Sequence, residues 1–71
     1  MIRIRLREEA SKAGISQSKL SRRADVDLRI IQRVYRDPYT NINLHTLDKL
    51  AMALNINAST LIDSVTDIET P

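Results

Sequence analysis

The sequence predicts a single all-α domain, a compact bundle of five short helices, and three observations favour this class. The chain has 71 residues, enough for one small core. It contains neither Trp nor Phe, so the core must be built from aliphatic side chains, which suits packed helices. Apolar residues recur at helical spacing in stretches separated by Gly14 and Pro38, which act as helix breakers.

Composition argues against several function classes. Without cysteine the chain has no disulfide framework and no thiolate site, and its single histidine, His45, cannot form a histidine-based metal set. No apolar run approaches the ~20 residues that cross a bilayer. Ser16, His45 and Asp48 do not converge as a catalytic triad in a fold of this kind. We therefore expect a cytoplasmic protein that is not an enzyme, with no cofactor, metal or membrane partner.

Charge is sorted along the chain. The segment from Met1 to Arg36 holds ten basic residues against four acidic ones, whereas the segment from Asp37 onward holds Lys49 against five acids. A basic half of this kind can meet a polyanion while the acidic half faces elsewhere. The alternative is that both halves are ordinary solvated helix faces.

The first helix is expected from about Arg3 to Ala13. Gly14 follows it and can end the helix in the left-handed conformation. Ile2, Ile4 and Leu6 alternate with arginines, which is a period of two. The first few residues could therefore form a short strand instead.

Two further helices follow, joined by a short turn. Ser16 has the position of an N-cap for a helix from Gln17 to Ala24. The three residues 25–27 make the turn. Asp27 then caps a third helix that runs from Leu28 to Arg36. Its negative charge would repel a polyanion, so we interpret Asp27 as a helix cap.

The second half predicts two more helices. Asn43 caps a fourth helix from Leu44 to Leu54, and Asn55 can take the left-handed conformation after it. The inward stripe of this helix follows a 3.6-residue period and comprises Leu44, Leu47, Leu50, Ala51 and Leu54.

A fifth, last helix is expected after Ile56, capped by Asn57 or Ser59. It would carry Leu61, Ile62 and Val65 toward the interior. Residues 1–65 then form the domain, and residues 66–71 form a frayed tail.

Residues Gln17–Arg36 have the pattern of a helix-turn-helix motif, two short helices joined by a turn with an apolar residue. Small and apolar side chains at the inner positions lock the helices at a steep angle; these are Leu20, Ser21, Ala24, Val26, Ile31 and Val34. The outer face of the second helix would then enter a DNA major groove, so the candidate base contacts are Leu28, Arg29, Gln32 and Arg33.

The segment from Leu6 to about Ile62 resembles the Cro/repressor-type (XRE) helix-turn-helix family, the lambda-repressor-like fold. The resemblance is carried by residues 14–17 (GISQ), 19–24 (KLSRRA), 26–34 and 46–54 (TLDKLAMAL). It implies a five-helix fold, operator DNA as ligand, and a homodimer on a near-palindromic site.

Three departures from the family pattern stand out. Asp25 occupies a position where the family commonly has Gly, which predicts a modest strain in the turn. Ala10 and Tyr35 replace an Arg–Glu pair that the family often has, and we predict that the Tyr35 ring packs over Ala10. Leu28 is apolar where the family generally has a polar reader; it could contact a thymine methyl group or have no role.

The expected phosphate contacts surround the recognition helix. Gln17 begins its helix, where the amide and the free backbone N–H groups can hold a phosphate, as the resemblance also implies. Four residues around the loop after the third helix could contact the DNA backbone or serve only in loop packing and capping; they are Arg36, Tyr39, Asn41 and Asn43. Lys19, on the outer surface of its helix, could touch the flanking DNA backbone or only raise the local positive potential.

The sequence thus predicts a sequence-specific transcriptional regulator, a repressor, that binds double-stranded DNA as a homodimer. Its self-association surface could be a carboxyl-terminal apolar stripe of Leu61, Ile62, Val65 and Ile68, or strand pairing through Ile2 and Ile4. The alternative function is protein interaction, as an antitoxin that covers a toxin partner or as an adaptor with the same fold.

Overall fold

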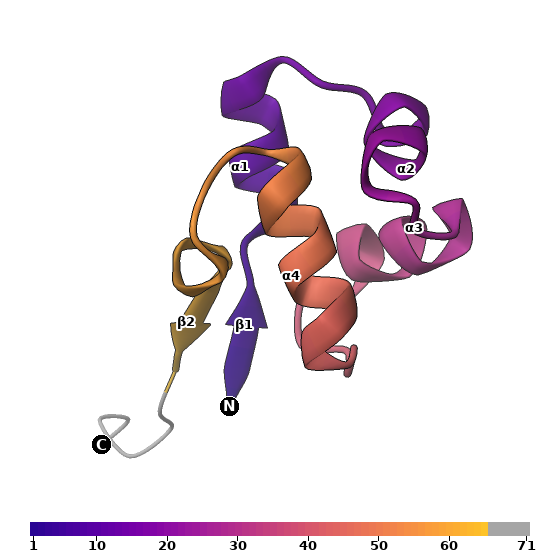
Figure 1. Cartoon of the computed structure of the whole chain (residues 1–71). Coiled ribbons are helices and arrows are strands. Elements are labelled where there is room, and N and C mark those ends of the chain that lie inside the picture. The colour runs from indigo at the N-terminus through magenta and orange to yellow at the C-terminus, as the bar shows by residue number, and fades with distance from the viewer. Residues whose placement is uncertain (66–71) are drawn as a thin grey trace, which may run out of the picture.

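The computed structural model describes residues 1–65, which form a helical domain with a small two-stranded sheet (Figure 1). In chain order the elements are β1 (Ile2–Ile4), α1 (Leu6–Ala13), α2 (Gln17–Ala24), α3 (Leu28–Arg36), α4 (Leu44–Ala53), the 3-10 turn η1 (Ala58–Leu61) and β2 (Ile62–Ser64). In Figure 1 the two strands lie on one side of α4, and α2 and α3 lie on the other. None of the helices within residues 1–65 is long and apolar enough to cross a membrane.

Side-chain caps fix the starts of three helices, as the sequence predicts. Ser16, Asp27 and Asn43 each precede a helix, and their side-chain oxygens accept hydrogen bonds from backbone N–H groups of its first turn at 3.2, 2.8 and 2.7 Å. These bonds satisfy donors that have no partner inside the helix. The predicted boundaries of α2 and α3 are therefore confirmed.

Left-handed residues follow three of the helices. Gly14, Asp25 and Asn55 have φ angles of 66°, 56° and 59°. Asp25 adopts the conformation that glycine takes more easily, and the N–H of Val26 then donates to the carbonyl of Ser21. The turn is thus formed without glycine, because Asp tolerates this region better than most residues.

The chain ends of the domain differ from the five-helix prediction. A strand occupies Ile2–Ile4 and α1 begins only at Leu6, so the alternation of isoleucines with arginines was the correct guide there. The expected last helix is a 3-10 turn followed by β2, which pairs antiparallel with β1 so that Ile4 faces Ile62. The fold is therefore not purely all-α. Pairing two strands gives β-branched Ile62 a better position than a helix would.

One residue of the predicted α4 stripe lies outside the core. Leu44 is 79% exposed, whereas Leu47, Leu50 and Ala51 are buried. Leu44 is the first residue of α4 and lies beyond the end of the core, so the helical period alone placed it wrongly.

The core is shared among the main elements. Leu6 of α1, Leu20 of α2, Ile31 of α3, Leu50 of α4 and Leu61 of η1 are completely buried. Such aliphatic burial, at about 25 cal/mol per Å² of apolar surface, is the main force that holds α3 against the rest of the domain. The expected frayed tail, residues 66–71, lies outside the described residues.

Candidate nucleic-acid interface

The α2–α3 unit is locked from its inner side. Ala24, Val26 and Val34 are buried in addition to Leu20 and Ile31, as the helix-turn-helix pattern predicts. The hydroxyl of Ser21 donates a 2.5 Å hydrogen bond to the carbonyl of Val26 in the turn. The orientation of α3 relative to α2 is therefore fixed by packing and by a hydrogen bond across the turn.

The opposite side of α3 faces solvent. Arg29, Gln32, Arg33 and Arg36 are exposed, and Leu28 is half-buried. The helix carries three arginines and no acidic residue. It therefore presents a polar and positively charged surface whose position is set by the buried side of the same helix.

Arg29 forms an ion pair with Asp27 at the start of α3. Its guanidinium lies 3.1 Å from the Asp27 carboxylate, and its backbone N–H donates to the same side chain at 2.8 Å. The hydrogen bond from Arg29 lowers the pKa of Asp27, and the carboxylate raises the pKa of Arg29. An exposed pair of this kind is weak, so Arg29 can leave Asp27 for another acceptor at small cost.

An open depression of about 520 Å³ lies where α1, α2 and α3 meet. Gln17, Gln32 and Arg36, three of the predicted contacts, line it together with Arg7 and Tyr35. The depression thus joins guanidinium and carboxamide groups from three helices. Groups of these types bind phosphate oxygens.

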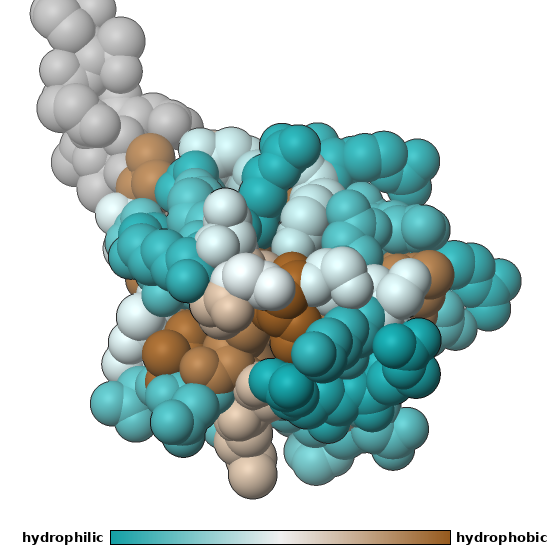
Figure 2. Space-filling model, turned by 90° about the horizontal axis from the view of Figure 1, so that it is seen from above, coloured by the Kyte–Doolittle hydropathy of each residue, from teal (hydrophilic) through white to brown (hydrophobic). Residues whose placement is uncertain are grey.

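None of the five residues that line this depression is acidic, and several carboxylates elsewhere are paired with other bases. Glu9 lies 3.4 Å from Arg5 and 3.2 Å from Lys12, and Asp63 lies 3.7 Å from Arg3 and 3.6 Å from Arg5. By contrast, Arg7, Arg33 and Arg36 have no carboxylate within 4 Å in residues 1–65. On the face seen in Figure 2, hydrophilic side chains surround a smaller hydrophobic area.

Most of the chain matches a known protein family. Residues 5–67 match the family model of the Cro/C1-type HTH DNA-binding domain. The chain belongs to this family. No curated protein shows detectable similarity to the chain. The protein with this Cro/C1-type domain is accordingly a DNA-binding regulator.

Sequence reasoning did not single out Arg7, which lines this depression of the Cro/C1-type domain. The Arg7 guanidinium lies over the Tyr35 ring, 5.8 Å from its centre. The ring is half-buried and packs against the core cluster that includes Ala10, and Arg7 lies over it. The sequence offered one signal for Arg7. Ala10 and Tyr35 replace the Arg–Glu pair that the family often has, and Arg7 lies one helical turn before Ala10 on the same face, where it can reach Tyr35.

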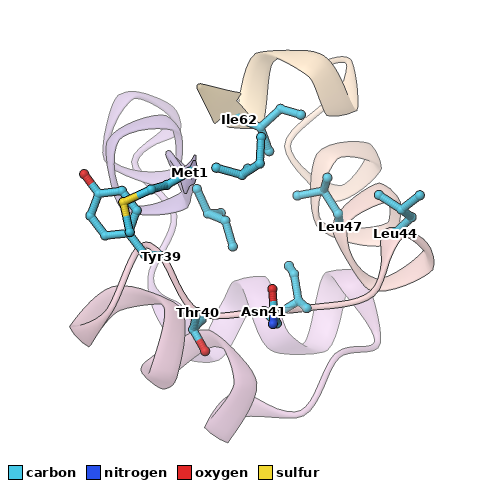
Figure 3. Close-up of a pocket in the computed structure, with 10 residues that line it drawn as sticks. Met1, Tyr39, Thr40, Asn41, Leu44, Leu47 and Ile62 are labelled. Carbon is cyan, nitrogen blue, oxygen red and sulfur yellow. The ribbon is translucent and has the colours of Figure 1, made fainter. Parts of the chain in front are cut away.

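The remaining predicted phosphate contacts of the Cro/C1-type domain lie outside this depression. Lys19 is exposed on α2, and the side-chain oxygen of Asn43 is occupied as the cap of α4. Tyr39 and Asn41 line a different, largely apolar groove of about 490 Å³. Figure 3 shows this groove, where side chains of Met1, Leu47 and Ile62 surround the space beside the loop before α4.

Proposed function

We propose that the protein is a transcriptional repressor that recognises a specific DNA sequence by inserting α3 into the major groove. The observation that carries this proposal is the outer face of α3, which is exposed, rich in arginine and free of acidic residues, on a Cro/C1-type domain. A major groove about 12 Å wide admits a helix of this size.

The proposed base readers are Leu28, Arg29, Gln32 and Arg33. Arginine can form two hydrogen bonds with guanine, and glutamine can do so with adenine. Gln32 also lines the depression, so it lies at the border between the reading face and the phosphate contacts. Contacts to the DNA backbone are proposed for Gln17, Lys19, Arg36, Tyr39, Asn41 and Asn43.

We further propose that two copies bind one operator. A single small domain reads too few base pairs to be selective, and two recognition helices about 34 Å apart would read two half-sites. The exposed apolar side chains Met1, Ile2 and Leu44 support the β1 and α4 sides of the groove of Figure 3 as the contact surface, while Tyr39 and Asn41 on its loop side stay with the DNA backbone. Leu61 of the alternative stripe is completely buried in the core.

Titration of labelled duplexes tests the reading face. Duplexes selected from a random pool by the wild-type protein are compared with scrambled ones, and the stoichiometry is measured. Arg33→Ala should cost about 1–3 kcal/mol, confined to particular base positions. Lys19→Ala should weaken binding to all sequences alike and reduce the salt dependence.

The contrast between these two variants decides the assignment. Equal losses on selected and scrambled duplexes for Arg33→Ala would remove it from the base readers. Wild-type affinity that ignores sequence would replace the repressor with an adaptor-type function, and one chain per two-half-site duplex would contradict the dimer.

A further inference from the structure

The depression between α1, α2 and α3 contains two cations and no anion. Arg7 and Arg36 both line it, and neither has a carboxylate within 4 Å in the part of the chain that the structure describes. The other lining side chains are the carboxamides of Gln17 and Gln32 and the ring of Tyr35. Two like charges in one depression repel each other, so an anion placed between them would be favoured.

The Tyr35 ring holds the Arg7 guanidinium without neutralising it. A cation within about 6 Å of a ring centre is attracted by the ring's electrons, and the distance here is 5.8 Å. A guanidinium held by a ring face makes no hydrogen bond to it, so its N–H donors stay free for another acceptor. A glutamate at position 35 would instead occupy these donors and cancel the charge. Tyrosine therefore leaves Arg7 oriented and fully charged.

The two arginines reach the depression from different sides. Arg7 comes from α1 and Arg36 from the end of α3, while Gln17 begins α2. An anion bound there would contact all three helices at once. Leu6 of α1 and Ile31 of α3 are buried in the same core and α1 contacts α3, so the core fixes the two helices from which these arginines extend.

We propose that Arg7 is a ligand of one DNA backbone phosphate in this depression, and that the Tyr35 ring is a positioning residue for it. Arg36 and the two glutamines complete the site. This inference rests on the proposed function, because the phosphate belongs to the duplex that α3 reads. Arg7 then gives the domain a phosphate contact from α1, outside the helix-turn-helix motif.

The experiment measures duplex affinity of the whole chain over a range of salt concentrations. Arg7→Gln should weaken binding about 10-fold at ~0.1 M salt and reduce the slope of log K against log salt by about 0.9, the value for one phosphate contact. The matched control is Arg23→Gln. Arg23 is exposed and lies beside Lys49 and Met52, toward α4 and away from the depression. Arg23→Gln removes the same charge as Arg7→Gln, and we expect it to lose less duplex affinity.

A second measurement locates the phosphate. Single methylphosphonate substitutions are placed in turn along the selected duplex, each of which removes one negative charge. At one backbone position per half-site the wild-type protein should lose clearly more affinity than Arg7→Gln, which keeps only the contacts of Arg36 and the two glutamines. Equal losses for both proteins at every position would overturn the phosphate contact and leave Arg7 with only a long-range charge effect.

The role of Tyr35 is tested by two substitutions. Tyr35→Phe keeps the ring and should bind as the wild type does, whereas Tyr35→Leu should lose as much affinity as Arg7→Gln. Combining Tyr35→Leu with Arg7→Gln should add no further loss, since both changes remove the same contact. Circular dichroism verifies that Tyr35→Leu is folded. If Tyr35→Phe loses as much as Tyr35→Leu, the hydroxyl rather than the ring is the contact, and the positioning role is wrong.

Failure of DNA binding and failure of the Arg7 site give different results in these experiments. If the wild-type chain binds no duplex even at low salt, the proposed function is wrong. If it binds selectively but Arg7→Gln leaves both affinity and slope unchanged, only the site at Arg7 is wrong.

Discussion

Arg3 and Arg5 near the sheet are paired with carboxylates, whereas two of the three arginines of α3, Arg33 and Arg36, are not paired within residues 1–65. Arg3 and Arg5 lie beside Asp63 of β2, and Arg5 also lies beside Glu9, which is only 8% exposed. Arg33 and Arg36 on α3 have no such partner among residues 1–65. The first group ties β1 and α1 to the carboxyl end of the domain, and the second group is available to a ligand.

This difference shows why a count of charges along the chain overstates the charge available to DNA. The amino-terminal half has an excess of basic residues, but several of these are balanced by acids that the fold brings next to them. A paired surface arginine contributes little to phosphate binding unless it leaves its partner. We therefore propose that Arg7, Arg33 and Arg36, rather than the paired arginines, supply most of the positive charge that binds DNA.

The largest expected effect is on the free energy of unfolding, and it differs between the buried and the exposed side of α3. Ile31→Ala should lower the free energy of unfolding by about 2–5 kcal/mol, because it leaves a cavity in the completely buried core. Urea unfolding measures the change. Arg33→Ala, on the exposed side, should change it by no more than about 0.5 kcal/mol. A comparable loss from both would mean that the exposed side of α3 also supports the fold.

A smaller effect is expected from the paired arginines. Arg3→Gln should leave duplex affinity and its salt dependence nearly unchanged and should lower the free energy of unfolding by at most about 1 kcal/mol. Arg33→Gln, which removes the same charge, should weaken binding clearly. Salt-dependent duplex titration of both variants measures this. A reduction of the salt slope by Arg3→Gln would show that the sheet side also contacts DNA.

The smallest effect concerns the phenol of Tyr35. Burial raises its pKa above the ordinary value, and the charge of Arg7 partly opposes this. Because the folded-state pKa is higher than the unfolded one, the contribution of Tyr35 to stability is complete below the unfolded pKa. It is lost as pH rises through the folded pKa. Arg7→Gln should raise the pKa of Tyr35 further. Phenolate absorbance in a Tyr39→Phe background measures this, and a lower pKa would contradict the contact with Arg7.

Much of the helix-turn-helix unit could be predicted from the sequence because its determinants are local. Ser16, Asp27 and Asn43 cap helices through hydrogen bonds to residues two or three positions away. The left-handed residues Gly14 and Asn55 end helices by their own backbone preference. The period of apolar residues then identified the buried side of α3, and with it the side that faces solvent.

Only the tertiary structure decided the features that join distant parts of the chain. Ile62 is in a strand because Ile4, far away in the sequence, pairs with it, and the same pairing brings Asp63 beside Arg3 and Arg5. Arg7 meets Tyr35 because α1 packs against α3. Local preference determines where helices begin and end, whereas the partner of a strand or of a charge depends on which elements the core brings together.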